Sequence, residues 1–184
     1  IYNKAPVIMR NLEDILGEEA FKDALTEYLK TYYEKNATWD DLIAIVNGYT
    51  EQDLSKWSSD WVQGKGAPVY EYQIDEQKSV ISFVQKQDVG DQIWPQKIAY
   101  TSSKDIGKQY QVFLDRAQVD APFQIGKQPS MINTDGRGYG YFKVSQNDWE
   151  SQYQTYGKSE KAITRAAFWL NSWEGVLHND LQPL

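Results

Sequence analysis

Residues 64–74 read Gly-Lys-Gly-Ala-Pro-Val-Tyr-Glu-Tyr-Gln-Ile, and the spacing of the apolar residues changes within this stretch. Its two glycines and its proline are typical of a segment that ends a helix. After them, Tyr70, Tyr72 and Ile74 alternate with polar residues, which is the period of two that a β-strand requires. The stretch therefore predicts a boundary between a helical region and a β region.

On the N-terminal side of this boundary, apolar residues recur every three or four positions, as they do along the buried stripe of an amphipathic helix. The pattern predicts four helices, with stripes formed by Ile8, Leu12 and Ile15; by Phe21, Ala24, Leu25, Tyr28 and Tyr32; by Trp39, Leu42, Ile43 and Val46; and by Leu54, Trp57 and Trp61. Gly17 separates the first two helices as a C-terminal cap. Thr38, with Asp41 three residues later, predicts a capping box at the start of the third helix.

On the C-terminal side, short strand-like segments bounded by Gly, Pro, Asp or Asn continue to Val144. They are residues 70–74, 79–86, 97–101, 110–114, 122–125, 130–133 and 139–144. Six or seven short strands in succession favour a small β-sandwich. The helical period returns at residues 148–156 and 163–177. The predicted fold class is therefore α+β, with helices, a small antiparallel β-sandwich and helices again.

The composition excludes several classes of function. The 184 residues include one histidine and no cysteine, and they carry a net charge of −7. No disulfide framework or thiolate metal site can form. A zinc site would have to combine His178 with carboxylates, whereas catalytic zinc is normally held by at least two imidazoles or by thiolates. An acidic chain without a basic stripe is a poor partner for phosphates, so we expect no nucleic-acid partner.

The apolar runs are much shorter than the ~20 residues that span a bilayer, and no basic head followed by an apolar stretch opens the chain. We therefore expect a soluble chain that does not insert into a membrane, either cytoplasmic or exported. Its first residue is Ile1 rather than Met, and Ile1 leads directly into a patterned segment. We interpret the chain as a piece of a longer protein.

Residues 136–140, Gly-Arg-Gly-Tyr-Gly, have two interpretations: a phosphate-binding loop or a tight hairpin turn. No Lys-Ser or Lys-Thr pair follows them, and the next predicted element is a strand. A phosphate-binding loop needs the N-terminus of a helix at that point. The pattern therefore favours the hairpin turn.

Other polar motifs have structural explanations beside functional ones. Residues 36–38, Asn-Ala-Thr, match the N-glycosylation pattern, yet they also end one predicted helix and cap the next. His178 lies near the end of the last predicted helix, where a polar or cationic group is favourable, so we expect a structural residue rather than a ligand. Carboxylate pairs at residues 13–14, 18–19 and 40–41 offset helix dipoles more often than they form the catalytic pair of a glycosidase.

The strand region is rich in aromatic residues, which either pack the core or form a sugar-stacking face. They include Tyr70, Tyr72, Trp94, Tyr100, Tyr110, Tyr139 and Tyr141. Core packing is the interpretation that we favour. The sugar-stacking interpretation leads to a competing function, a non-catalytic module for carbohydrate or protein binding. In such a module, helices would pack against an aromatic-rich β-sandwich.

Residues 2–10, Tyr-Asn-Lys-Ala-Pro-Val-Ile-Met-Arg, and residues 16–21, Leu-Gly-Glu-Glu-Ala-Phe, resemble a segment of a known family. They are similar to the Tyr-x-Lys-Gly segment and the following helices of zinc-dependent aminopeptidases of the aminopeptidase N type, the gluzincin metallopeptidase family. The order and spacing of residues 28–69 continue the resemblance. The β region, with Trp94-Pro95, resembles the family's β-domain, and residues 162–177 resemble the opening of its C-terminal helical domain.

The resemblance implies a multidomain fragment of a zinc metallo-aminopeptidase that hydrolyses N-terminal residues from peptides. Residues 1–66 would form the helical C-terminal part of a thermolysin-like catalytic domain, residues 67–145 the β-sandwich, and residues 146–184 the start of an α-helical C-terminal domain. The family's His-Glu-x-x-His helix, its downstream Glu ligand and its Gly-x-Met-x-Asn strand have no counterpart in this sequence. We therefore expect the zinc ligands to lie upstream, and the fragment alone to bind no zinc and to be inactive. We also expect self-association through the catalytic-domain face that the missing helices would cover.

The resemblance places the family's transition-state tyrosine at Tyr2, the one catalytic residue that it assigns to this chain. A phenol with an ordinary pKa near 10 stays protonated at neutral pH and can donate a hydrogen bond to the oxyanion that forms at a peptide carbonyl. The family's glycine after Tyr-x-Lys is Ala5 here, which remains small enough for close helix packing. The other interpretation of Tyr2 is an ordinary aromatic at a helix entrance. Lys4, beside it, is predicted to be a packing residue.

Overall fold

The computed structural model describes residues 4–87, 92–102, 104–105, 107–126, 130–144 and 146–182. The chain forms two compact units, Ile1–Lys65 and Gly66–Leu184. The division falls inside the glycine- and proline-containing stretch that changes the hydrophobic period. The whole is an α+β chain in which helices accompany small, mainly antiparallel sheets, as the sequence predicts. Among the residues described, no helix is both long and apolar enough to cross a membrane.

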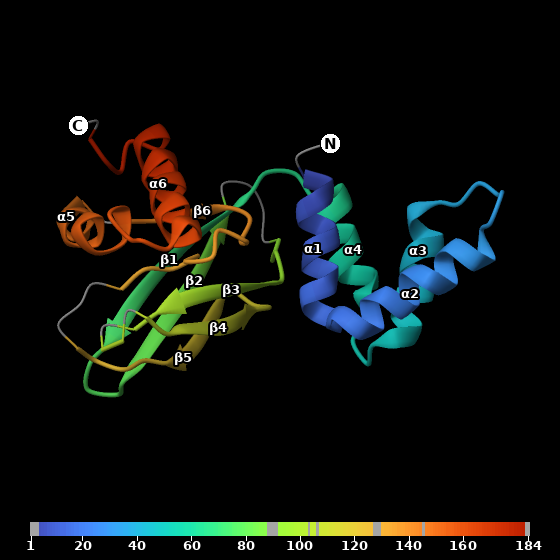
Figure 1. The fold of residues 1–184 in the computed structure, drawn as a ribbon, viewed down its shortest axis with the longest axis horizontal. Coiled ribbons are helices and arrows are strands. Elements are labelled where there is room, and N and C mark those ends of the chain that lie inside the picture. The colour runs from blue at the N-terminus through green and yellow to red at the C-terminus, as the bar shows by residue number, and fades with distance from the viewer. Residues whose placement is uncertain are drawn as a thin grey trace. The chain divides into compact units, whose positions relative to one another are not determined.

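The first unit consists of helices, as the apolar periodicity predicts (Figure 1). They are α1 (Lys4–Leu16), α2 (Glu18–Thr31), α3 (Trp39–Val46), the short 3₁₀ turn η1 (Asn47–Tyr49) and α4 (Leu54–Gln63). Gly17 has a φ of 86°, a left-handed conformation that favours glycine, and this allows α2 to begin directly after α1 ends. The predicted separation of the first two helices at Gly17 is therefore confirmed.

The predicted capping box at the start of α3 is also present. The Asp41 N–H donates to Thr38 Oγ1 at 3.2 Å, and the Thr38 N–H donates to Asp41 Oδ2 at 2.8 Å. The second of these hydrogen bonds holds the pKa of the Asp41 carboxyl below its usual value. Two backbone groups at the helix start are satisfied in this way, and the chain direction between α2 and α3 is fixed.

We expect Thr38→Ala to lower the free energy of unfolding by about 0.5–2 kcal/mol, because it removes the side-chain oxygen that caps α3. Urea unfolding followed by circular dichroism measures the effect. Thr26→Ala is the matched control, since the Thr26 hydroxyl donates only to the Lys22 carbonyl within α2. Equal stability of the two variants would show that the cap contributes nothing to the fold.

The core of the first unit is built around tryptophans. Trp57 and Trp61 are buried on α4, with Leu12 of α1 and Val46 of α3 among the other buried residues. A buried indole N–H is stable when it finds an acceptor. The Trp57 N–H donates to Asn11 Oδ1 at 3.1 Å, which ties α4 to α1.

The described part of the second unit forms two small sheets. One has the strand order β5-β2-β1-β6 and the other pairs β3 with β4. The strands are β1 (Pro68–Asp75), β2 (Val80–Gln87), β3 (Gln96–Thr101), β4 (Gln109–Leu114), β5 (Gln118–Pro122) and β6 (Tyr141–Phe142). All pairings are antiparallel except the short one between β1 and β6, which is parallel.

The main core of this unit combines inward-facing residues of both sheets. It includes Tyr70, Ile81 and Phe83 from the larger sheet and Ile98 and Tyr100 from the smaller one. The rings of Phe83 and Tyr100 meet edge to face with centroids 5.2 Å apart. Period-two alternation along the strands therefore locates the core correctly, because every second side chain faces the other sheet.

Three predicted strands differ from the structure. The strand expected at residues 122–125 is β5, which instead ends at Pro122. Residues 130–133 make only an isolated bridge, between Ile132 and Tyr100, and residues 139–144 contribute only the two-residue β6. The sequence pattern predicts longer strands than the structure has. In these segments, backbone groups form hydrogen bonds with side chains instead of pairing with a neighbouring strand. The Gly138 N–H, for example, donates to Asn133 Oδ1 at 2.9 Å.

The predicted hairpin turn at residues 136–140 is wrong. A hairpin joins adjacent antiparallel strands, whereas the strand that follows this loop, β6, runs parallel to β1. The tight turn lies earlier, where the Gly136 N–H donates to the Asn133 carbonyl at 3.1 Å. Residues 137–140 then lead into β6 as an irregular loop.

Helices return after β6, as predicted. They are α5 (Gln146–Gln152), a π-helical turn η2 (Tyr153–Gly157) and α6 (Ala162–Leu177), which packs beside β6 (Figure 1). Together they enclose a second core that includes Trp149, Tyr156 and Phe168. Tyr156 OH and Thr101 Oγ1 lie 2.7 Å apart, so a hydrogen bond joins this core to β3.

Candidate functional site

Tyr2, the predicted catalytic residue, lies outside the described residues. The structure begins two residues later at Lys4, the first residue of α1. Lys4 is partly buried, and this burial lowers the pKa of its ammonium group. It lines a cavity of about 310 Å³ in the first unit together with Ala5, Ile8, Met9, Trp39, Trp61 and Val62. The described lining is almost entirely apolar, and Lys4 is the only charged residue among these seven, so this part of α1 offers packing surface.

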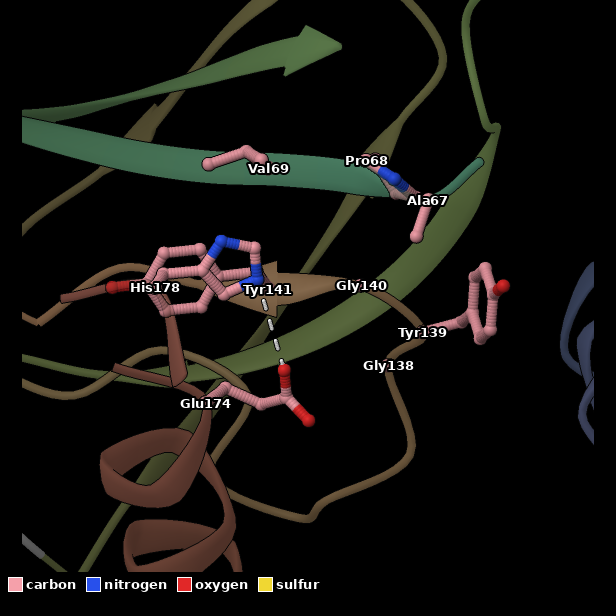
Figure 2. Close-up of a pocket in the computed structure, with 9 residues that line it drawn as sticks. All are labelled: Ala67, Pro68, Val69, Gly138, Tyr139, Gly140, Tyr141, Glu174 and His178. Atoms are coloured by element: carbon pink, nitrogen blue, oxygen red, sulfur yellow. Dashed lines mark ion pairs between the residues drawn. The ribbon is translucent and has the colours of Figure 1, made fainter. Parts of the chain in front are cut away.

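A second cavity, of about 290 Å³, lies in the second unit at the C-terminal end of α6. Figure 2 shows the start of β1 above it, the loop before β6 on the right, the overlapping rings of Tyr141 and His178 on the left, and Glu174 below them. Its lining residues are Ala67, Pro68, Val69, Gly138, Tyr139, Gly140, Tyr141, Glu174 and His178. Aromatic rings, backbone and one carboxylate therefore meet around the same space.

His178 and Tyr141 form a stacked pair at this cavity. Their ring centroids lie 4.3 Å apart and their planes are within 2° of parallel. The Tyr141 OH donates to Asp180 Oδ2 at 2.7 Å, and burial together with this carboxylate raises the pKa of Tyr141. The hydroxyl therefore stays protonated at neutral pH and holds the ring in place, which in turn fixes the position of the imidazole.

An ion-pair network supports the stacked pair from the side of the sheet. Lys143 Nζ lies 3.3 Å from Asp180 Oδ1 and 3.7 Å from Glu71 Oε1. Lys86 Nζ lies 2.6 Å from the other oxygen of Glu71. These contacts join β1, β2, the segment after β6 and the residues after α6. Because the side chains are partly exposed, we expect the network to contribute more to local order than to stability.

A buried glutamine positions the loop that carries Tyr139. Gln96 Nε2 donates to the Tyr139 carbonyl at 2.7 Å and to Tyr70 OH at 2.6 Å, and Gln96 Oε1 accepts from the Tyr139 N–H at 2.8 Å. The Tyr139 ring lies against Trp94 with a centroid distance of 5.8 Å. Sequence reasoning does not identify Gln96, because a glutamine at the start of a strand carries no local signal of its long-range partners.

The described residues do not fit the zinc ion that the family resemblance implies for the parent protein. Within the described ranges, no group of three or more His, Asp and Glu side chains is arranged to hold a metal ion. His178, the one imidazole of the chain, has its Nε2 3.9 Å from Glu174 Oε2 and its ring against Tyr141. Catalytic zinc normally takes three protein ligands, and this arrangement supplies two at most.

The other polar residues that the sequence suggested as candidates, His178, the carboxylate pairs and residues 36–38, lie at helix ends. His178 caps the C-terminus of α6, as expected for a helix-end residue. The carboxylates of residues 18–19 and 40–41 lie in the first turns of α2 and α3, where they offset the helix dipole. The expectation is wrong for residues 13–14, which lie near the C-terminal end of α1, where a carboxylate does not offset the dipole. Thr38 caps α3, as the structural interpretation of residues 36–38 predicts, but α2 already ends at Thr31 rather than at Asn36.

The aromatic residues of the strands form core rather than an open stacking face. Tyr70, Trp94, Tyr100 and Tyr141 are all less than 5% exposed. Burial removes the ring faces that a sugar would need. The core interpretation of these four residues is therefore confirmed.

Comparison with known proteins gives matches to peptidases. Residues 1–61 match the family model of the Peptidase family M1 domain. Aminopeptidase N of Streptomyces lividans is 22% identical over 94% of this chain and 23% of its own length. Aminopeptidase M1-C of Oryza sativa subsp. japonica is 34% identical over 37% of this chain and 8% of its own length. These matches confirm the resemblance to aminopeptidases of the aminopeptidase N type.

The fold also has a counterpart among solved structures. The crystal structure of Legionella pneumophila aminopeptidase A in complex with aspartic acid matches 90% of this chain and 20% of its own chain, with a TM-score of 0.69 and 16% sequence identity. At this identity the match concerns the fold alone. The chain spans less than a quarter of the length of these relatives.

Proposed function

We propose that the chain is part of a zinc-dependent aminopeptidase that hydrolyses N-terminal residues from peptides. The observation that carries the proposal is the match of residues 1–61 to the M1 peptidase domain, in a region where the four helices follow the predicted order. The match to an aminopeptidase N, which covers 94% of this chain and 23% of that protein, adds support for the second unit. In this proposal the zinc ligands lie outside the chain, and the chain alone is inactive.

Within that enzyme, Tyr2 is proposed to stabilise the transition state. Its hydroxyl would donate a hydrogen bond to the oxyanion that develops at the scissile carbonyl, an interaction that strengthens as charge accumulates on that oxygen. The helix α1 starts at Lys4, and its buried face, which includes Ile8 and Leu12, anchors it in the first unit.

The described parts are proposed to correspond to three domains of the parent enzyme. Residues 1–66 would close the catalytic domain, residues 67–145 would form the β-domain and residues 146–184 would begin the C-terminal helical domain. Support for the last assignment comes from α6, whose outer face exposes large apolar residues: Ile163, Trp169, Leu170, Trp173 and Leu177. Such a face is typical of a helix that other helices cover.

The competing function, a carbohydrate- or protein-binding module, has less support. It needs an exposed aromatic platform on the sandwich, and four of the aromatics considered for it are buried. The peptidase proposal is tested by replacing the Tyr2 hydroxyl in the intact parent enzyme. If the Tyr2 hydroxyl stabilises the transition state, its removal should lower kcat sharply. If Tyr2 only packs against its neighbours, kcat should stay nearly unchanged.

A further inference from the structure

We propose that the cavity at the C-terminal end of α6 binds a guanidinium group, such as the side chain of an arginine residue in a peptide. The proposal concerns only the second unit and is independent of the peptidase chemistry. It rests on the charge of the cavity, on its aromatic wall and on its size.

The charge around the cavity favours a cation. The C-terminal end of the 16-residue helix α6 is the negative end of its dipole, and Glu174 adds a carboxylate at the same end. The carbonyl groups of Glu174, Gly175 and Val176 already accept backbone hydrogen bonds from residues 178–181, so the carboxylate is the main attraction for a cation. Asp180 and Glu71 lie on the far side of the stacked pair, but Lys143 and Lys86 already neutralise them. Among the described residues, the ion pair found for Glu174 is the long one with His178, at 3.9 Å. The Glu174 carboxylate, whose side chain is 45% exposed, is therefore available to a ligand.

The aromatic wall favours a guanidinium over an ammonium. The exposed ring at this wall is the imidazole of His178, whose side chain is 42% exposed and which lies parallel to the buried ring of Tyr141, and Figure 2 shows it beside the Glu174 carboxylate. A guanidinium is planar, so it can stack on a ring while its N–H groups pair with a carboxylate in two parallel hydrogen bonds. An ammonium group has no such plane and is more strongly hydrated, so it gains less from the same walls.

The size and chemistry of the cavity argue against other ligands. A volume of about 290 Å³ is at the lower limit of ligand pockets, which suits the end of a side chain better than a whole cofactor. An anion would meet the Glu174 carboxylate and the negative end of the helix. A divalent cation would need several oxygen ligands, and the cavity offers one carboxylate.

The proposal is tested by titrating the 184-residue chain with three small probes and following amide chemical shifts by NMR. The probes are the N-acetyl, N-methylamide derivatives of arginine, lysine and citrulline. Citrulline has nearly the shape of arginine but no charge. We expect saturable shifts with the arginine probe at Gly138, Tyr139, Gly140 and His178, weaker binding of the lysine probe and no saturation with citrulline.

Two variants locate the site. Glu174→Gln keeps the shape of a partly exposed side chain and should weaken binding of the arginine probe about tenfold or more, because a charge-assisted hydrogen-bonded pair is lost. Glu160→Gln is the matched control, since it removes the same charge at an exposed position outside the cavity and should bind as the unmodified chain does. Saturable binding of citrulline, lysine binding as tight as arginine, unchanged binding by Glu174→Gln, or no saturable shift with arginine would each overturn the proposal.

Discussion

Tyr2→Phe in the intact parent enzyme is expected to lower kcat by roughly 10²-fold or more, with zinc content and folding preserved. The substitution removes one hydroxyl and keeps the ring. If that hydroxyl donates to the developing oxyanion, its loss removes one of the donors that stabilise the transition state, and loss of one such donor typically costs about 2.7–4 kcal/mol. The interaction is proposed to be much stronger in the transition state than in the ground state, so KM should change little.

Steady-state kinetics on a peptide or an aminoacyl arylamide separates this role from others. A transition-state interaction lowers kcat and kcat/KM by the same factor. Tyr33→Phe is the matched control: it removes a hydroxyl from a tyrosine that is 72% exposed just after α2, and it should leave both constants unchanged. A large rise in KM with kcat preserved would mean that Tyr2 binds substrate rather than the transition state. An unchanged kcat would place the catalytic tyrosine elsewhere.

Gly140→Ala is expected to destabilise the second unit by roughly 2–6 kcal/mol, combining about 1–3 kcal/mol of backbone strain with about 1–3 kcal/mol of overpacking. Gly140 has a φ of 128°, which L-residues with side chains rarely adopt. A Cβ atom there would also lie 2.5 Å from the Pro68 carbonyl oxygen and 2.8 Å from Pro68 Cγ. The first contact is with backbone of β1, which cannot move aside as a flexible side chain would. Because a domain is stable by only about 5–15 kcal/mol, the loss is large.

Urea unfolding of the 184-residue chain measures this effect, and Gly66→Ala separates its two causes. Gly66 has a φ of 88°, and nothing lies within 4 Å of the point that a Cβ atom would occupy, so its substitution adds strain without a clash. We expect Gly66→Ala to cost about 1–3 kcal/mol and Gly140→Ala to cost more. If Gly140→Ala were no more destabilising than Gly66→Ala, the close packing of the loop against β1 would be contradicted.

The helices and their limits follow from local patterns in the sequence. Apolar spacing identifies the four helices of the first unit, and Thr38 with Asp41 marks the start of α3. These signals are local because a helix satisfies its own backbone and buries one stripe. The main strands are equally readable, since Tyr70, Tyr72 and Ile74 show the strand period.

The region around the second cavity is not predictable in the same way. Its geometry depends on contacts between residues that are far apart in sequence, such as Gln96 with Tyr139 and Tyr141 with Asp180. The parallel pairing of β6 with β1 likewise depends on where the whole loop is anchored. Glycine density at residues 136–140 indicates a special backbone but does not say which strand the next segment will join.

The assignment of Tyr2 depends on family resemblance and not on local pattern. A tyrosine two residues before a helix gives no chemical signal by itself, and the partners that would reveal its role are the zinc ligands and the substrate. The described residues supply no group that could hold the metal. The match of residues 1–61 to the M1 peptidase domain supports the family on which the assignment rests.

The central claim, that this chain belongs to a zinc aminopeptidase whose metal site it does not itself contain, is tested most directly by sequencing the coding region immediately upstream of Ile1. The account predicts an open reading frame continuous with this chain that encodes a His-Glu-x-x-His helix, followed by a glutamate ligand, before Tyr2. An upstream sequence that lacks this motif, or a start codon directly before Ile1, would contradict the account.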